Sequence, residues 1–133
     1  MFPRDLSVLP LIFISVLLAS GSQLVLKIGM TSPAVQDALA MRREGVIGPG
    51  SLLIGIGTHP AVLAGLFCFG LSAVVWLFVL SRIEVSQAYP CVALGIVLTT
   101  IGGGLLLGEQ ISITRWLGLA VIVTGVGLVA ASR

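Results

Sequence analysis

The stretch "AYPCVALGIVLTTIGGGLLLGEQISITRWLGLAVIVTGV", residues 88–126, decides the fold because it holds two long apolar segments joined by one short polar link. An apolar run of about 20 residues is long enough to cross a membrane as a helix. The link carries the only charged side chains of this stretch, Glu109 and Arg115. A link this short makes the flanking helices antiparallel neighbours, so the sequence predicts a membrane-spanning helical hairpin.

The rest of the chain is as apolar as this hairpin. Of its 133 residues, 57% are hydrophobic and 9% are charged, with a mean hydropathy of +1.18. A water-soluble domain carries about 25% charged residues, so the composition predicts an all-α membrane protein. We expect a single domain, residues 1–133, that forms a four-transmembrane-helix bundle with spans at about 9–30, 61–80, 88–107 and 112–131.

The N-terminal segment also fits a second interpretation, that of a signal peptide. Arg4 precedes an apolar core at residues 8–18, and the small residues Ala19 and Gly21 follow it. We expect the segment to remain in the protein as the first membrane helix.

The first link, residues 31–60, is too long to be a bare loop in a compact domain. Ser32 followed by Pro33 is a helix-start signal, and Gly45 is suited to end the helix. Between them, apolar and polar side chains occupy different faces. We therefore predict a short interfacial helix over residues 33–44, between spans one and two, and predict no definite form for residues 45–60.

Positive charges divide almost evenly between the two sides of this bundle. Arg4, Arg82 and Arg133 are expected on one side, whereas Arg42, Arg43 and Arg115 are expected on the other, with Lys27 near that second side. The positive-inside rule therefore predicts no orientation. Insertion in both directions and dependence on a partner subunit both stay open.

Several functional classes find no support in the sequence. It contains no nucleophile–base pair and no phosphate-binding glycine loop, so we expect neither an enzyme nor a catalytic residue, and no cofactor. His59 is the single histidine, and Cys68 and Cys91 fall in separate spans, so we expect no metal site. No basic run with interleaved aromatic residues indicates nucleic acid.

Lys27 stands near the end of the first span, in "SVLLASGSQLVLKIGM", residues 15–30, and no acidic residue lies between Leu6 and Met30. Two interpretations stay open for it. It either extends to the lipid headgroups, as lysines at span ends do, or faces a groove and binds an anionic headgroup. Ser15, Ala19, Ser22, Gln23 and Lys27 share one small, polar helix face, which suits a groove, although the three polar residues before Lys27 equally suit helix–helix contacts.

Three further candidate binding residues each have an alternative role. Glu109 either lies in solvent paired with Arg115, or meets the amine of a substrate. Trp76 and Tyr89 either belong to an interfacial aromatic belt or line the groove.

Glycine spacing predicts where helices approach closely. Gly104 and Gly108 form a G-x-x-x-G step in the third span. Gly118 and Gly125 lie on nearly one face of the fourth span. That face serves either as a subunit contact or in packing within the chain.

The two quoted stretches resemble the small multidrug resistance and drug/metabolite transporter (EamA-like) superfamily. The shared features are the Ala88–Tyr89 start of the third helix, the Gly108–Glu109 pair at its end, a glycine-spaced fourth helix and Lys27 at the end of the first. Within this group the chain is most similar to the paired small subunits proposed to flip 4-amino-4-deoxy-L-arabinose-phosphoundecaprenol. This resemblance implies a multi-pass protein of the bacterial inner membrane, with a role in lipopolysaccharide modification.

One departure from the superfamily pattern concerns drug export. Exporting members carry a glutamate eight residues before the lysine, and this position is Ala19 here. A carboxylate within the membrane is what exchanges protons for a cationic drug. We therefore do not expect proton-coupled drug export of that kind.

The resulting expectation is a flippase, or flippase subunit, for a polyprenyl-phosphate-linked sugar. Its headgroup would contact Lys27, Gln23, Ser22, Tyr89, Glu109 and Trp76, its tail would stay among membrane lipids, and the working unit would be a homodimer or a heterodimer with a similar small subunit. A small multidrug-resistance-type exporter of small solutes and a non-transporting scaffold or modulator subunit are the alternatives.

Overall fold

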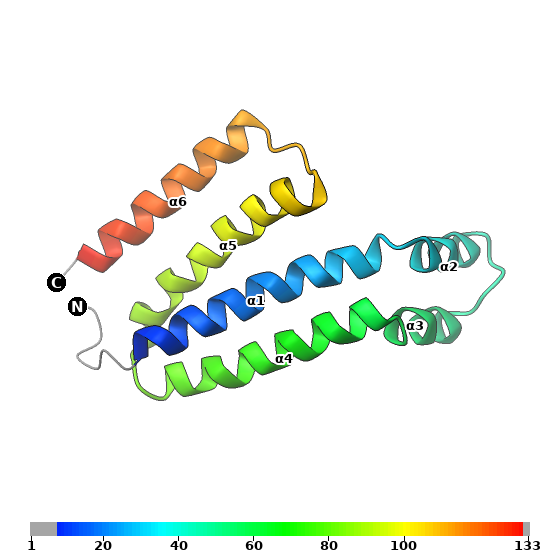
Figure 1. Cartoon of the computed structure of the whole chain (residues 1–133), viewed down its shortest axis with the longest axis horizontal. Coiled ribbons are helices and arrows are strands. Elements are labelled where there is room, and N and C mark those ends of the chain that lie inside the picture. Colours follow the sequence, from blue (N-terminus) through cyan, green and yellow to red (C-terminus); the bar gives the residue numbers. More distant parts are fainter. Residues whose placement is uncertain (1–7, 132–133) are drawn as a thin grey trace.

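The computed structural model describes residues 8–131, and within this range every regular secondary-structure element is an α-helix (Figure 1). The predicted all-α class is therefore confirmed. The helices are α1 (Val8–Met30), α2 (Pro33–Arg43), α3 (Pro49–Gly57), α4 (Pro60–Leu80), α5 (Val85–Leu107) and α6 (Ile113–Ala131).

Three of these helices are long and apolar enough to cross a membrane, namely α1, α4 and α5. The fourth predicted span is a shorter apolar helix, α6, which meets the composition requirement over Ile113–Val129. The helix boundaries agree with the predicted spans to within three residues.

Helix α1 is the centre of the bundle. It packs along α4 on one side and along α5 on the other, while α6 packs mainly on α5 and lies at the outside (Figure 1). The C-terminal ends of α1 and α5 therefore lie at one end of the bundle, together with the start of α6. Arg42, Arg43 and Arg115 lie toward that end and Arg82 toward the other, as predicted, while Arg4 and Arg133 fall outside the described residues.

Small residues bring α1 and α4 together. Ser15 and Ser72 exchange hydrogen bonds: the Ser15 hydroxyl donates to the Ser72 carbonyl at 3.1 Å, and the Ser72 hydroxyl donates to the Ser15 carbonyl at 2.9 Å. Further along, a Cβ atom added at Gly65 would lie 2.6 Å from Leu26 Cγ. Both contacts require the two helix backbones to approach closely.

The contact between α1 and α5 follows the same principle. The Ser20 hydroxyl donates to the Gly95 carbonyl at 3.3 Å, and a Cβ atom at Gly102 would lie 2.5 Å from Leu24 Cδ1. The predicted G-x-x-x-G step at Gly104 and Gly108 is wrong as a helix–helix contact. Gly104 faces the link that follows α5, and Gly108 ends the helix.

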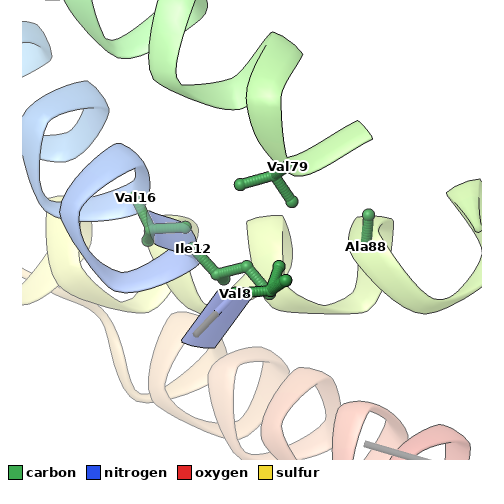
Figure 2. Close-up of a cluster of buried hydrophobic side chains, with 5 residues drawn as sticks. All are labelled: Val8, Ile12, Val16, Val79 and Ala88. Carbon is green, nitrogen blue, oxygen red and sulfur yellow. The ribbon is translucent and has the colours of Figure 1, made fainter. Parts of the chain in front are cut away.

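Apolar packing closes the opposite end of the bundle. Val8, Ile12 and Val16 of α1 meet Val79 of α4 and Ala88 of α5 in one buried cluster (Figure 2). Large apolar side chains outside this cluster are mostly exposed, among them Phe67 at 73% and Leu105 at 80%. Such an exposed apolar surface is expected of helices that face lipid.

The first link contains the predicted helix and one that was not predicted. Helix α2 follows Ser32 with Pro33 in its first turn, and Gly45, at φ 76°, ends it. The sequence did not predict α3, because the glycines of residues 48–57 disfavour a helix despite the start signal at Pro49. The two short helices pack on each other beyond the ends of α1 and α4.

The third span begins earlier than expected. Helix α5 starts at Val85, three positions before Ala88, so Pro90 lies inside the helix and not in its first turn. Because proline has no backbone N–H, the carbonyl of Ser86 loses its usual helical partner.

The close approach of α1 and α4 predicts that Gly65→Ala destabilises the protein. The new methyl group would overlap Leu26, and overpacking of this kind costs about 1–3 kcal/mol. Gly70→Ala is a matched control on the same helix, because nothing described lies within 4 Å of its added Cβ. Thermal unfolding in detergent should show a lower midpoint for Gly65→Ala alone. Equal midpoints for the two variants would contradict the observed α1–α4 packing.

Candidate functional site

An ion pair joins the ends of α1 and α5. The distance between Lys27 Nζ and Glu109 Oε1 is 3.6 Å. Lys27 lies in the last turn of α1, and Glu109 lies in the link between α5 and α6. The acidic partner of Lys27, which the sequence around it lacks, therefore comes from the other half of the chain. The predicted pairing of Glu109 with Arg115 is wrong, since the carboxylate turns toward Lys27.

Two glycines set the position of Glu109. Gly108 adopts a left-handed conformation, with φ 67°, which a residue with a side chain rarely adopts. The backbone N–H groups of Gly108 and Glu109 both donate to the Gly103 carbonyl, so the link folds back over the end of α5. Gly103 leaves room for the carboxylate, because a Cβ atom there would lie 2.8 Å from Glu109 Oε2.

The ion pair is open to its surroundings. The Lys27 side chain is 54% exposed and that of Glu109 is 42% exposed. Exposed pairs of this kind contribute about 0–1 kcal/mol to stability, because solvent screens the charges and ordering two long side chains costs entropy. Separating the two side chains therefore costs little, and both charges remain available to a ligand.

A hollow of about 340 Å³ lies beside this pair, between the end of α5 and the start of α6. Glu109 is its charged residue, and Trp116 adds an indole from the first turn of α6. The remaining walls are apolar or bare backbone, from Ile101, Gly104, Leu105 and Ile111. Glu109 thus borders both Lys27 and the hollow.

The other polar residues of α1 separate into different roles. Ser22 is buried, and its hydroxyl donates to the Ala19 carbonyl of its own helix at 2.7 Å. Ser15 is a helix–helix contact, as one of its two interpretations predicted. Gln23 is exposed one turn before Lys27, and its amide has no protein partner among residues 8–131. Gln23 and Lys27 therefore remain together at an accessible surface.

Trp76 and Tyr89 lie at the opposite end of the bundle. Their rings meet edge to face, with centroids 6.3 Å apart and planes at 77°. Trp76 also packs against the apolar cluster of Val8 and Val79. The six predicted binding residues therefore do not form one site, because Lys27, Gln23 and Glu109 are at one end and these two aromatic residues at the other.

Sequence reasoning missed Trp116 as a site residue and Ser20 and Ser72 as helix contacts. Trp116 directly follows the polar link that carries Glu109, and this proximity was a usable signal. The two serines carried no such signal, because their partners are backbone carbonyls on other helices.

The glycine face of α6 is open within the chain. Nothing described lies within 4 Å of a Cβ atom added at Gly118 or Gly125. Among the described residues, no other helix therefore packs closely on these two glycines, and the subunit contact stays a prediction. Among the α6 side chains that the structure describes, Leu119 is the buried one.

These features define a class of protein: a small multi-span helical membrane protein, held together through small residues, with accessible opposite charges at one end of its spans. The chain matches the EamA-like transporter family over residues 3–131. It therefore belongs to the EamA-like transporter family.

Similar proteins of known name come from several bacteria. The probable 4-amino-4-deoxy-L-arabinose-phosphoundecaprenol flippase subunit ArnF of Shewanella sediminis is 36% identical over 118 residues, covering 86% of this chain and 81% of that protein. The corresponding ArnE subunit of Pseudomonas syringae is 36% identical over 77 residues, covering 53% and 71%. The ArnE subunit of Pseudomonas savastanoi is 41% identical over 78 residues, covering 52% and 68%. No solved structure matches significantly.

The exposure of the ion pair predicts a small coupling energy in a double-mutant cycle. Lys27→Ala and Glu109→Ala, alone and combined, should show a small but measurable coupling of about 0.2–1 kcal/mol in detergent unfolding, with all variants still helical. A second cycle between Glu109→Ala and Arg115→Ala is the control and should show none. Coupling to Arg115 in place of Lys27 would contradict the assigned partner.

Proposed function

We propose that this protein is a flippase, or a subunit of one, for a polyprenyl-phosphate-linked sugar such as aminoarabinose-phosphoundecaprenol. Family membership supports a transport role, and the similar ArnE and ArnF proteins carry that substrate in their names. The protein would act in the bacterial inner membrane, moving its substrate between leaflets without changing it chemically. It would therefore have no catalytic residue.

The observation that carries this proposal is the accessible Lys27–Glu109 pair. The headgroup of this aminosugar phosphate carries a negative phosphate and a positive amine on opposite sides of a single sugar ring. Lys27 would bind the phosphate and Glu109 the amine, so that the headgroup replaces the internal pair. Each of the four charges then still has a partner of opposite sign, so removing the headgroup from water costs little free energy.

The spans and the first link would sit in the membrane as follows. We take α1, α4, α5 and α6 as four spans of one domain, with α6 completing the bundle although it is the shortest. Helix α2 would lie at the interface, where its charged residues meet water. The polyprenyl tail would remain in lipid beside the exposed apolar faces of the spans.

Proton-coupled export of cationic drugs has less support. The described spans contain no aspartate or glutamate, and Ala19 replaces the carboxylate that drug exporters use. A non-transporting subunit remains the other alternative, and a transport measurement distinguishes it.

The proposed working unit is a dimer, formed with a second copy or with a similar small subunit. A single chain offers only one wall to a headgroup, since α6 packs mainly on α5 and leaves Gly118 and Gly125 uncovered. In lipid, glycine faces of this kind allow a second helix to approach closely.

Transport of the lipid-linked aminosugar should depend on the charge at Lys27. We expect Lys27→Ala to abolish flipping in reconstituted vesicles, and Lys27→Arg to keep part of it, because charge is retained while shape is not. Wild-type activity in Lys27→Ala would leave Lys27 only a role at the lipid interface.

A charge exchange separates the binding role from the structural one. The double variant Lys27→Glu with Glu109→Lys keeps an ion pair but reverses the positions of the two charges. We expect it to unfold near the wild-type temperature and yet to lose transport, because each end of the headgroup would meet a like charge. Restored transport would mean that the pair serves only the fold.

Dimer formation should depend on the glycine face of α6. Replacing Gly118 and Gly125 together by leucine should abolish crosslinking between subunits in native membranes and reduce transport with it. Gly127→Leu is the control, since this residue is also uncovered but lies about 200° around the helix from Gly125. An active double variant, with wild type crosslinking only as a monomer, would refute the dimer.

A further inference from the structure

We infer that the hollow between α5 and α6 is the subsite for the ammonium group of the substrate, with Trp116 as the residue that selects an aminosugar over a neutral sugar. The inference rests on the proposed function, since it identifies what part of the headgroup binds beside Lys27. Trp116 is thereby a binding residue and not only an interfacial aromatic.

The position of Glu109 connects the two halves of this site. Its Oε1 atom is 3.6 Å from Lys27 Nζ, while the side chain also borders the hollow. A headgroup whose phosphate approaches Lys27 therefore has its sugar next to Glu109, and an amine on that sugar meets the carboxylate at the mouth of the hollow. The folded-back link, held by the Gly103 carbonyl, sets this geometry.

The chemistry of the lining matches a small organic cation. Glu109 supplies the negative charge, and Trp116 also lines the hollow; an indole is the aromatic group that attracts an ammonium ion most strongly. The apolar remainder of the lining has no group to satisfy a second anion. A neutral hydroxyl in the same place would gain neither the ion pair nor the cation–π contact.

The size and location of the hollow also fit a single sugar. Its volume of about 340 Å³ is near the lower end of the range of about 300–1,000 Å³ for ligand pockets. It lies where the apolar helix α5 ends, which is where the headgroup of a lipid anchored in the membrane would be. Trp116, 48% exposed, is accessible from that level.

Separating the Lys27–Glu109 pair costs little free energy, so the charges of the ligand determine which sugar binds more tightly. The Lys27–Glu109 pair is about half exposed on both sides, so a ligand separates it at little expense. A zwitterionic headgroup supplies both charges with new partners. A neutral sugar phosphate satisfies Lys27 alone and leaves Glu109 without its cation.

The test compares binding of two short-chain probes, farnesyl phosphate-linked 4-amino-4-deoxy-L-arabinose and farnesyl phosphate-linked L-arabinose, to the full chain in nanodiscs. Wild type should bind the aminosugar about tenfold more tightly. Trp116→Leu and Glu109→Gln should each reduce this preference to about twofold or less, while Trp116→Phe, which keeps an aromatic face, should retain most of it. Phe67→Leu removes an exposed aromatic residue elsewhere and should change nothing.

The outcomes separate this inference from the flippase proposal. Equal binding of both probes by wild type, or an unchanged preference in Trp116→Leu, overturns the ammonium subsite, whatever the transport assay shows. Selective binding that depends on Trp116 supports the subsite. If wild-type vesicles nevertheless move neither lipid, the flippase proposal fails while the subsite stands.

Discussion

Close contact of α1 with both α4 and α5 is the constraint on which the rest of the structure depends. Lipid is as apolar as the side chains, so burying them brings two membrane helices together only weakly. Close contact between helix backbones at small residues holds the helices together instead. Ser15 and Ser72 exchange hydrogen bonds between α1 and α4, and Ser20 donates to the Gly95 carbonyl between α1 and α5. The apolar cluster around Val8 then closes one end of the three-helix contact.

The opposite end of the same contact creates the site. Because α1 and α5 pack side by side, the last turn of α1 arrives beside the link that follows α5, and Lys27 meets Glu109. A half-exposed pair adds little to stability. Its more informative property is that both charges are partly exposed and that Glu109 borders a hollow also lined by Trp116. Packing in the middle of the bundle and the exposed ion pair at its end are thus consequences of one arrangement.

Helix α6 differs from α1 and α5 in that it packs mainly on a single other helix. It packs mainly on α5, through residues such as Leu119, and leaves a glycine face open. In the proposed dimer this face is where a second subunit supplies the other wall of the headgroup path. Because Trp116 lies in the first turn of α6, a partner that packs along α6 would lie close to it.

The sequence by itself predicted every described helix except α3. Apolar length set the spans, and Ser32, Pro33 and Gly45 set the limits of α2, because these signals act within a few residues of chain. Only the tertiary structure decided the ion pair: no acidic residue is near Lys27 in the sequence, and Arg115 is the cation nearest to Glu109 along the chain, but packing of α1 on α5 brings Lys27 and Glu109 together. The predicted antiparallel spans already placed Trp76 and Tyr89 at the opposite end from Lys27, and the structure adds their edge-to-face contact. The physical reason is that a charge interacts with what lies near it in space, and here helices distant in sequence supply those neighbours.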